Sequence, residues 1–164
     1  MQAALVEENW PLIIPPLLTI IDDESTIYKI KGCELMTILL KNTPSSTLSR
    51  TGLGEVFEDA VLPYLAYLPT VTPEDESLQL LGAAYPALIS LVRTMFSGRN
   101  VIDIRRKHLD KIVRQGILKG YYHAREHVKI MELLVGQITV VVDEMGVWVV
   151  KHLKVCIRGM CVDF

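Results

Sequence analysis

The stretch from Thr51 to Pro73 limits the fold of this chain more than any other. It begins with two glycines, carries three acids in its first turns, and then places apolar residues at helical spacing between Val61 and Leu68. Early acids followed by apolar residues three and four positions apart are typical of an amphipathic helix. Pro69 ends this pattern, and Thr72 before a proline marks the start of another helix. The stretch therefore predicts two consecutive helices joined by a short turn.

An earlier segment, from Trp10 to Ser25, repeats this plan of an apolar run, an internal proline and an acidic turn. Pro16-Leu17-Leu18 and Pro63-Tyr64-Leu65 lie 47 residues apart, and two Asp-Glu-Ser triplets that open the following helices lie 52 apart. A period of roughly 40–47 residues in helix pairs indicates HEAT or armadillo architecture. We therefore predict an all-α, HEAT/armadillo-like superhelical solenoid of paired antiparallel helices. An irregular helical bundle is the alternative.

Helical spacing continues along nearly the whole chain, and no segment alternates convincingly with period two. Asn9 and Ser25 are the expected N-caps of the second and third helices, and Trp10, Phe57 and Trp148 are the expected core anchors. One domain is expected over residues 1–154, followed by a tail at 155–164 whose packing is left open. The expected helices cover about residues 2–8, 10–22, 26–42, 53–68, 73–96, 101–118, 124–143 and 146–155.

The composition indicates the compartment. The longest uncharged run, Ser77 to Val92, has 16 residues with Pro86 inside it, short of the roughly 18 that a membrane span needs. The three cysteines have no metal-binding spacing, and their odd number fits a reducing compartment. Glu7 and Glu8 lie where a signal peptide would be basic. We expect a cytoplasmic or nuclear protein that does not cross a membrane.

Charge divides the chain unevenly. Residues 1–98 hold 12 acids and 5 bases, whereas residues 99–164 hold 7 acids and 12 bases. The basic run from Arg99 to Lys119 is interpreted as a solvated helix face, as a ridge for an acidic protein partner, or as a nucleic-acid site. No aromatic residue interrupts this run, which weakens a role in binding single strands. The residues expected to contact partners are Glu55, Glu58 and Asp59 on the acidic helix and Arg105, Arg106, Lys107, Lys111 and Arg114 on the basic one.

On the basic helix, three of these residues, Lys107, Lys111 and Arg114, fall along one side when the helix is drawn at its ordinary period. Ile112 and Val113 then lie toward the buried stripe. This arrangement predicts a basic ridge that an acidic partner surface would meet. Electrostatic complementarity of that kind acts mainly on the rate of association.

The segment from His123 to His127 spells H-x-x-E-H, which is the zinc signature of the inverted metalloproteases. On one helix, the two histidines would share a face and Glu126 would act as the base. A third ligand is required, and neither Glu132 nor Glu144 has the long downstream separation that such enzymes use. A charged helix start is therefore favoured, and no metal or other cofactor is expected. A small metallohydrolase remains an alternative.

Four segments together resemble the TELO-two-interacting-protein-two family, the third subunit of the triple-T (TTT) co-chaperone complex. The resemblance covers about residues 9–154. It implies a HEAT-like solenoid that is not an enzyme and that assembles with the other two TTT subunits. It also implies work with the ninety-kilodalton heat-shock chaperone in maturing phosphatidylinositol 3-kinase-related kinases, including those of DNA-damage and nutrient signalling. The segments are WPLIIPPLLTIIDD at Trp10–Asp23, RTGLGEVFEDAVLPYLAYLP at Arg50–Pro69, TPEDESLQLLGAAYPAL at Thr72–Leu88, and EHVKI with VDEMG at Glu126–Ile130 and Val142–Gly146.

Two features depart from that family. Its chains are substantially longer, so this one is expected to be a fragment or a short form. The last ten residues, Val155 to Phe164, do not resemble the family's continuation into further helix. The resemblance implies no metal role for His123 and His127.

Overall fold

The computed structural model describes residues 9–69, 71–97, 102–150 and 152, and within these ranges every regular element is a helix. The prediction of an all-α fold is confirmed. The α-helices are α2 (Trp10–Ile21), α3 (Thr26–Lys41), α4 (Ser45–Thr51), α5 (Leu53–Val61), α6 (Glu74–Met95), α7 (Ile102–Ile112), α8 (Lys119–Ala124) and α9 (Val128–Met145). Two 3-10 helices, η1 (Leu62–Ala66) and η4 (Gly146–Val149), and one π-helix, η3 (Val113–Leu118), complete the described elements.

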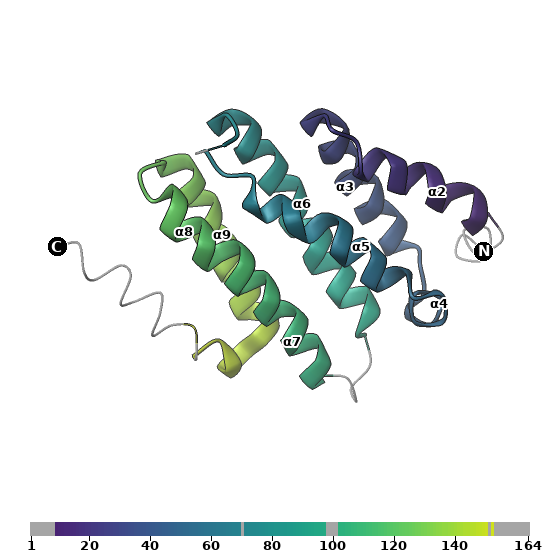
Figure 1. The fold of residues 1–164 in the computed structure, drawn as a ribbon. Helices are drawn as coiled ribbons and strands as arrows, with labels where there is room; N and C mark the ends of the chain where they lie inside the picture. The colour runs from purple at the N-terminus through teal and green to yellow at the C-terminus, as the bar shows by residue number, and fades with distance from the viewer. Residues whose placement is uncertain (1–8, 70, 98–101, 151, 153–164) are drawn as a thin grey trace.

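The helices lie in three successive pairs, side by side (Figure 1). α2 packs on α3, α5 with η1 packs on α6, and the continuous rod of α7, η3 and α8 packs on α9. Neighbouring pairs meet through α3 and α6, through α6 and α9, and through η1 and η3. One layer therefore holds α2, α5–η1 and α7–α8, and the other holds α3, α6 and α9. This order is compatible with a stack of HEAT-like repeats.

The helix boundaries agree closely with the sequence signals in the first half of the chain. Asn9 and Ser25 occupy the N-cap positions of α2 and α3, as predicted. α6 begins one residue later than expected, at Glu74, with Pro73 as its N-cap. The segment between the helices expected at 26–42 and 53–68, for which no helix was predicted, contains α4. This helix ends where Gly52 adopts a φ of 69°, a left-handed conformation that glycine tolerates best. The short helix expected at residues 2–8, and residues 153–155 of the last expected helix, lie outside the described residues.

The helix predicted over residues 53–68 changes character at Pro63. A proline has no N–H for the hydrogen bond to the carbonyl four residues earlier, so the α-helix ends at Val61 and a 3-10 helix follows. The Tyr64 hydroxyl donates a hydrogen bond to the carbonyl oxygen of Ile21, at the end of α2. This bond joins the first two helix pairs at the point where the backbone leaves α-helical geometry.

The rod of α7, η3 and α8 extends to Ala124, beyond the end predicted near residue 118. Its middle turn is a π-helix that contains Gly116. A Cβ atom at Gly116 would lie 2.7 Å from Leu65 Cδ1 and 2.7 Å from the Tyr85 hydroxyl oxygen. Glycine is therefore required for η3 to lie this close to η1 and α6.

Two of the three predicted core anchors are buried. Phe57 is fully buried and Trp10 is nearly so. Trp148 is 54% exposed, so its prediction as a core anchor is wrong. The helix α6 lies at the centre and is the one described helix long and apolar enough to cross a membrane. Half of the most apolar 18-residue segment of α6 is buried inside the protein, as expected of the core helix of a globular fold. Core residues of α6 include Leu80, Leu81, Ala84, Tyr85, Leu88, Leu91 and Val92.

Candidate partner-binding surface

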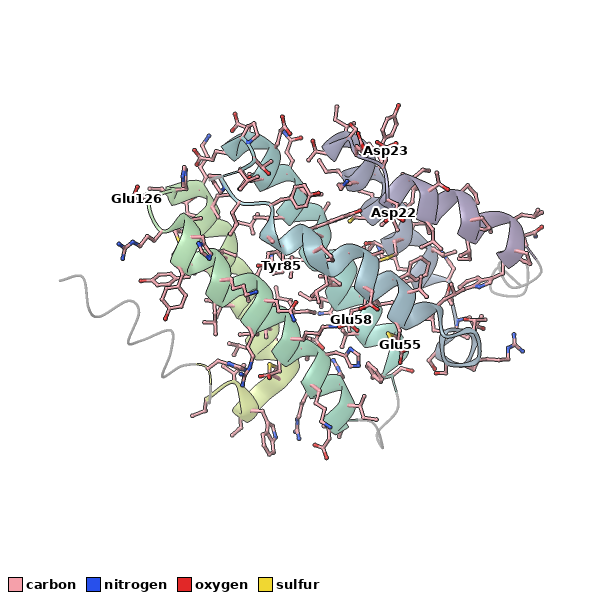
Figure 2. The ribbon with its side chains drawn as sticks, viewed as in Figure 1. Asp22, Asp23, Glu55, Glu58, Tyr85 and Glu126 are labelled. Atoms are coloured by element: carbon pink, nitrogen blue, oxygen red, sulfur yellow. The ribbon has the colours of Figure 1, made fainter. Side chains whose placement is uncertain are left out.

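One of the three acids predicted on α5, Glu58, points toward the basic rod of α7, η3 and α8 (Figure 2). The side chain of Glu58 is only 4% exposed. One carboxylate oxygen lies 2.5 Å from His108 Nδ1, and the other lies 3.2 Å from Lys111 Nζ. Phe96 stacks on the His108 ring with 4.8 Å between ring centroids. Glu58 therefore lies inside the fold, and the expectation that it contacts a partner is corrected.

The environment of Glu58 keeps it ionised. Burial by itself raises the pKa of this carboxyl group, because a charge is poorly solvated away from water. Hydrogen bonds and positive charge from His108, and then from Lys111, outweigh burial, so that the pKa lies below its ordinary value of 4.5. The ion pairs of Glu58 with His108 and Lys111 thus join α5 to α7, and we call this contact the ionic seam.

The two other acids predicted at this helix start remain on the surface. Glu55 is exposed, and the side chain of Asp59 is 79% exposed. The Asp59 carboxylate lies 3.9 Å from Lys111 Nζ, at the outer limit of an ion pair. Both acids stay available to a partner, and their role in partner contact remains a prediction.

A second, partly exposed group of ion pairs involves Arg105 and Arg106 of the rod. Glu144, near the end of α9, accepts hydrogen bonds from Arg93 at 2.7 Å and from Arg105. Arg106 lies 3.2 Å from Asp103 and also covers the ring of Trp148, with 4.4 Å between the guanidinium carbon and the ring centroid. This cation–π contact accounts for the exposed position of Trp148.

The predicted ridge of Lys107, Lys111 and Arg114 does not form a free basic surface. Lys111 turns toward Glu58, and Arg114 lies 3.0 Å from Asp110 on the preceding turn. Lys107 is exposed and has no ion-pair partner among the described residues. The sequence showed the acids and the bases but not which of them would pair, because Glu58 and Glu144 lie on other helices than the bases they contact.

The two histidines of the H-x-x-E-H segment do not share a helix. His123 lies in the last turn of α8, and His127 is the N-cap of α9 after the intervening turn. The helix expected to begin at residue 124 begins instead at Val128. His127 faces Glu74 at 3.4 Å, and Glu126 points outward from the turn (Figure 2). Within the described residues, no group of three His, Cys, Asp or Glu side chains is placed to hold a metal ion.

An apolar surface that the sequence did not single out lies at the α2–α3 end of the stack. A surface hollow of about 460 Å³ is lined by residues of α2 and α3, and another of about 610 Å³ is lined by residues of α3 and α6. Ile38 lines both hollows and is exposed. Leu12 and Leu35, which line the first hollow, are exposed as well. Periodicity marks such residues as apolar but cannot show that none of the described helices covers them.

A third hollow, of about 310 Å³, lies between the end of η1 and the rod. Ala66 and Leu68 form one side of it, and Gln115, Lys119 and His123 form the other. These three polar side chains follow one another at four-residue spacing, which places them on one face of the rod. All three are exposed and have no hydrogen-bond or ion-pair partner among the described residues.

The fold and these surfaces define an all-α protein of packed helix pairs with exposed apolar and polar hollows. The chain belongs to the Tti2 family, whose model matches residues 1–161. It is similar to the TEL2-interacting protein 2 of Saccharomyces cerevisiae (strain ATCC 204508 / S288c), with 29% identity over 128 residues. That similarity covers 70% of this chain and 29% of the relative, so the chain spans less than a third of the relative's length. No solved structure matches it.

Proposed function

We propose that this chain is a non-enzymatic helical scaffold that takes part in a TTT-type co-chaperone complex and so assists the maturation of phosphatidylinositol 3-kinase-related kinases. The observation that carries the proposal is the match of the Tti2 family along residues 1–161. The name of the yeast relative supports an interaction with TEL2. The cytoplasm, the nucleus or both are the proposed locations. Work with the heat-shock chaperone machinery belongs to the same proposal.

The surface supports a role in binding other proteins. Leu12, Leu35 and Ile38 are exposed around two neighbouring hollows at one end of the stack. Contiguous exposed apolar side chains usually mark a site of interaction. We therefore place the contact with the other TTT subunits on α2, α3 and the adjoining side of α6.

The test is co-purification of the full chain with TEL2 and the remaining TTT subunit after co-expression. A 1:1:1 assembly is expected for the parent, and replacing Ile38 by Glu should reduce recovery of the partners. Val71 provides the matched control, because it is 87% exposed and lies in the loop before α6, away from the hollows. If Val71→Glu reduces recovery as much as Ile38→Glu, the placement of the interface is wrong. If the parent recovers neither subunit, the proposed function itself fails.

A further inference from the structure

The hollow between η1 and the rod carries an inference about a second binding site. We propose that it is a docking site for an acidic, carboxylate-bearing segment of a protein partner. Lys119 supplies the positive charge, Gln115 and His123 supply polar groups beside it, and Ala66 and Leu68 supply an apolar wall. This site lies on the layer of α5–η1 and α7–α8, whereas the apolar hollow between α3 and α6 involves the other layer.

The first argument is that Lys119 is an unneutralised charge on a rod whose other bases are mostly paired. Arg105, Lys111 and Arg114 each contact a carboxylate of this chain. No acidic side chain lies within ion-pair distance of Lys119 in the described part of the chain, and Glu58 and Asp59 of α5 lie beside Lys111 instead. A carboxylate of a partner would therefore meet an attractive charge without displacing an internal ion pair.

The second argument is independent of charge and concerns the backbone. Gln115 lies within the π-helix η3, and Lys119 is the first residue after it. π-Helical turns are rare and are found frequently at functional sites, because their wider geometry is less favourable than an α-helix. Here the turn brings Gly116 against Leu65 and Tyr85, which fixes the distance between the rod and η1. Gln115 of the π-helix and Lys119 and His123 of α8 thus form one wall of the hollow.

The chemistry of the lining favours a carboxylate over a phosphate. Protein sites for phosphorylated segments are commonly built from arginine clusters that bind two oxygens at once. No arginine lines this hollow, which offers one lysine, one imidazole and one amide. The hollow has a volume of about 310 Å³. That space fits an Asp or Glu side chain together with an apolar neighbour against Ala66 and Leu68.

The experiment measures binding of a fluorescein-labelled peptide of alternating Glu and Leu to the full chain by fluorescence anisotropy. Two comparison peptides replace Glu by Gln or by phosphoserine. Lys119→Glu should weaken binding of the Glu peptide about tenfold, which corresponds to 1.4 kcal/mol, and Lys119→Gln should have an intermediate effect. Lys107→Glu is the matched control, because Lys107 is also exposed and also lacks an ion-pair partner among the described residues. Amide shifts in NMR spectra should locate the peptide at Gln115 and His123.

Several results would overturn the proposal. These are the absence of binding, equal binding of the Gln peptide, tighter binding of the phosphoserine peptide, or equal weakening by Lys107→Glu and Lys119→Glu. The inference rests on the proposed function in taking the ligand to be a protein segment, and the two fail separately. Loss of peptide binding with intact co-purification of the TTT subunits refutes the docking site alone. Peptide binding without co-purification supports the docking site and refutes the proposed complex.

Discussion

The buried carboxylate of Glu58 offers the sharpest test of the structure. Glu58→Gln keeps the shape of the side chain and removes its charge, so His108 and Lys111 lose the anion that they share. A hydrogen bond to a charged group contributes about 1.5–3 kcal/mol. Removing one partner of a fully buried ion pair costs about 3–5 kcal/mol. His108 and Lys111 are 22% and 37% exposed and can regain water, so we expect the smaller loss.

We therefore expect Glu58→Gln to lower the free energy of unfolding by about 2–3 kcal/mol at pH 7. For a chain of this size, each kcal/mol corresponds to about 2–4 °C in Tm, so Tm should fall by roughly 4–12 °C. Urea unfolding followed by circular dichroism and tryptophan fluorescence measures the first quantity, and a thermal scan measures the second. Removing the positive partner as well, in Glu58→Gln with Lys111→Met, should cost less than the sum of the two single changes.

The same carboxylate predicts how stability depends on pH. The pKa of Glu58 in the folded protein lies below its ordinary value of 4.5, so the folded protein binds this proton less readily than the unfolded chain. Its contribution is complete above about pH 4.5 and is lost as the pH falls through the folded-state pKa. The difference in stability between the parent and Glu58→Gln should accordingly shrink in acid.

The control for these measurements is Asp59→Asn. Asp59 is the neighbouring acid and is 79% exposed, with its carboxylate 3.9 Å from Lys111. An exposed ion pair contributes about 0.2–1 kcal/mol, and one at this distance should fall at the lower end. If Glu58→Gln destabilises the protein no more than Asp59→Asn does, the ionic seam between α5 and α7 does not stabilise the fold as argued.

Two further predictions concern packing. Gly116→Ala should destabilise the fold by about 1–3 kcal/mol, because the added Cβ would lie 2.7 Å from the Tyr85 hydroxyl oxygen. Gly136→Ala in α9 is the control and should be neutral or stabilising, because a Cβ there would have no atom within 4 Å. Equal stabilities of the two variants in urea titrations would contradict the close approach of η3 to α6. Phe57→Ala should lower the free energy of unfolding by about 3–5 kcal/mol, because Phe57 is fully buried. Trp148→Ala should lower it much less, because Trp148 is 54% exposed. Equal losses in Tm for the two variants would contradict the difference in burial between these residues.

The sequence by itself determined the all-α fold and the start of most helices. These features depend on residues close together in the chain, such as the N-caps Asn9 and Ser25 and the apolar residues of α6. Helical periodicity and the local conformational preferences of residues next to a helix start are enough to specify them. The family could also be identified from the sequence, because the resemblance of this chain to it rests on contiguous segments such as the one from Arg50 to Pro69.

Only the tertiary structure decided which charged residues pair with one another. The sequence presented Glu58 and Lys111 as separate surface groups, 53 positions apart in the chain, and only the packing of α5 on the rod brings them within 3.2 Å. Lys119, which was not among the residues predicted to contact partners, has no acid within ion-pair distance among the described residues. Coulombic attraction depends on distance in space and on burial, and neither is encoded in the spacing of residues along one helix. The residues that remain free to bind a partner were therefore visible only once the helices had been placed.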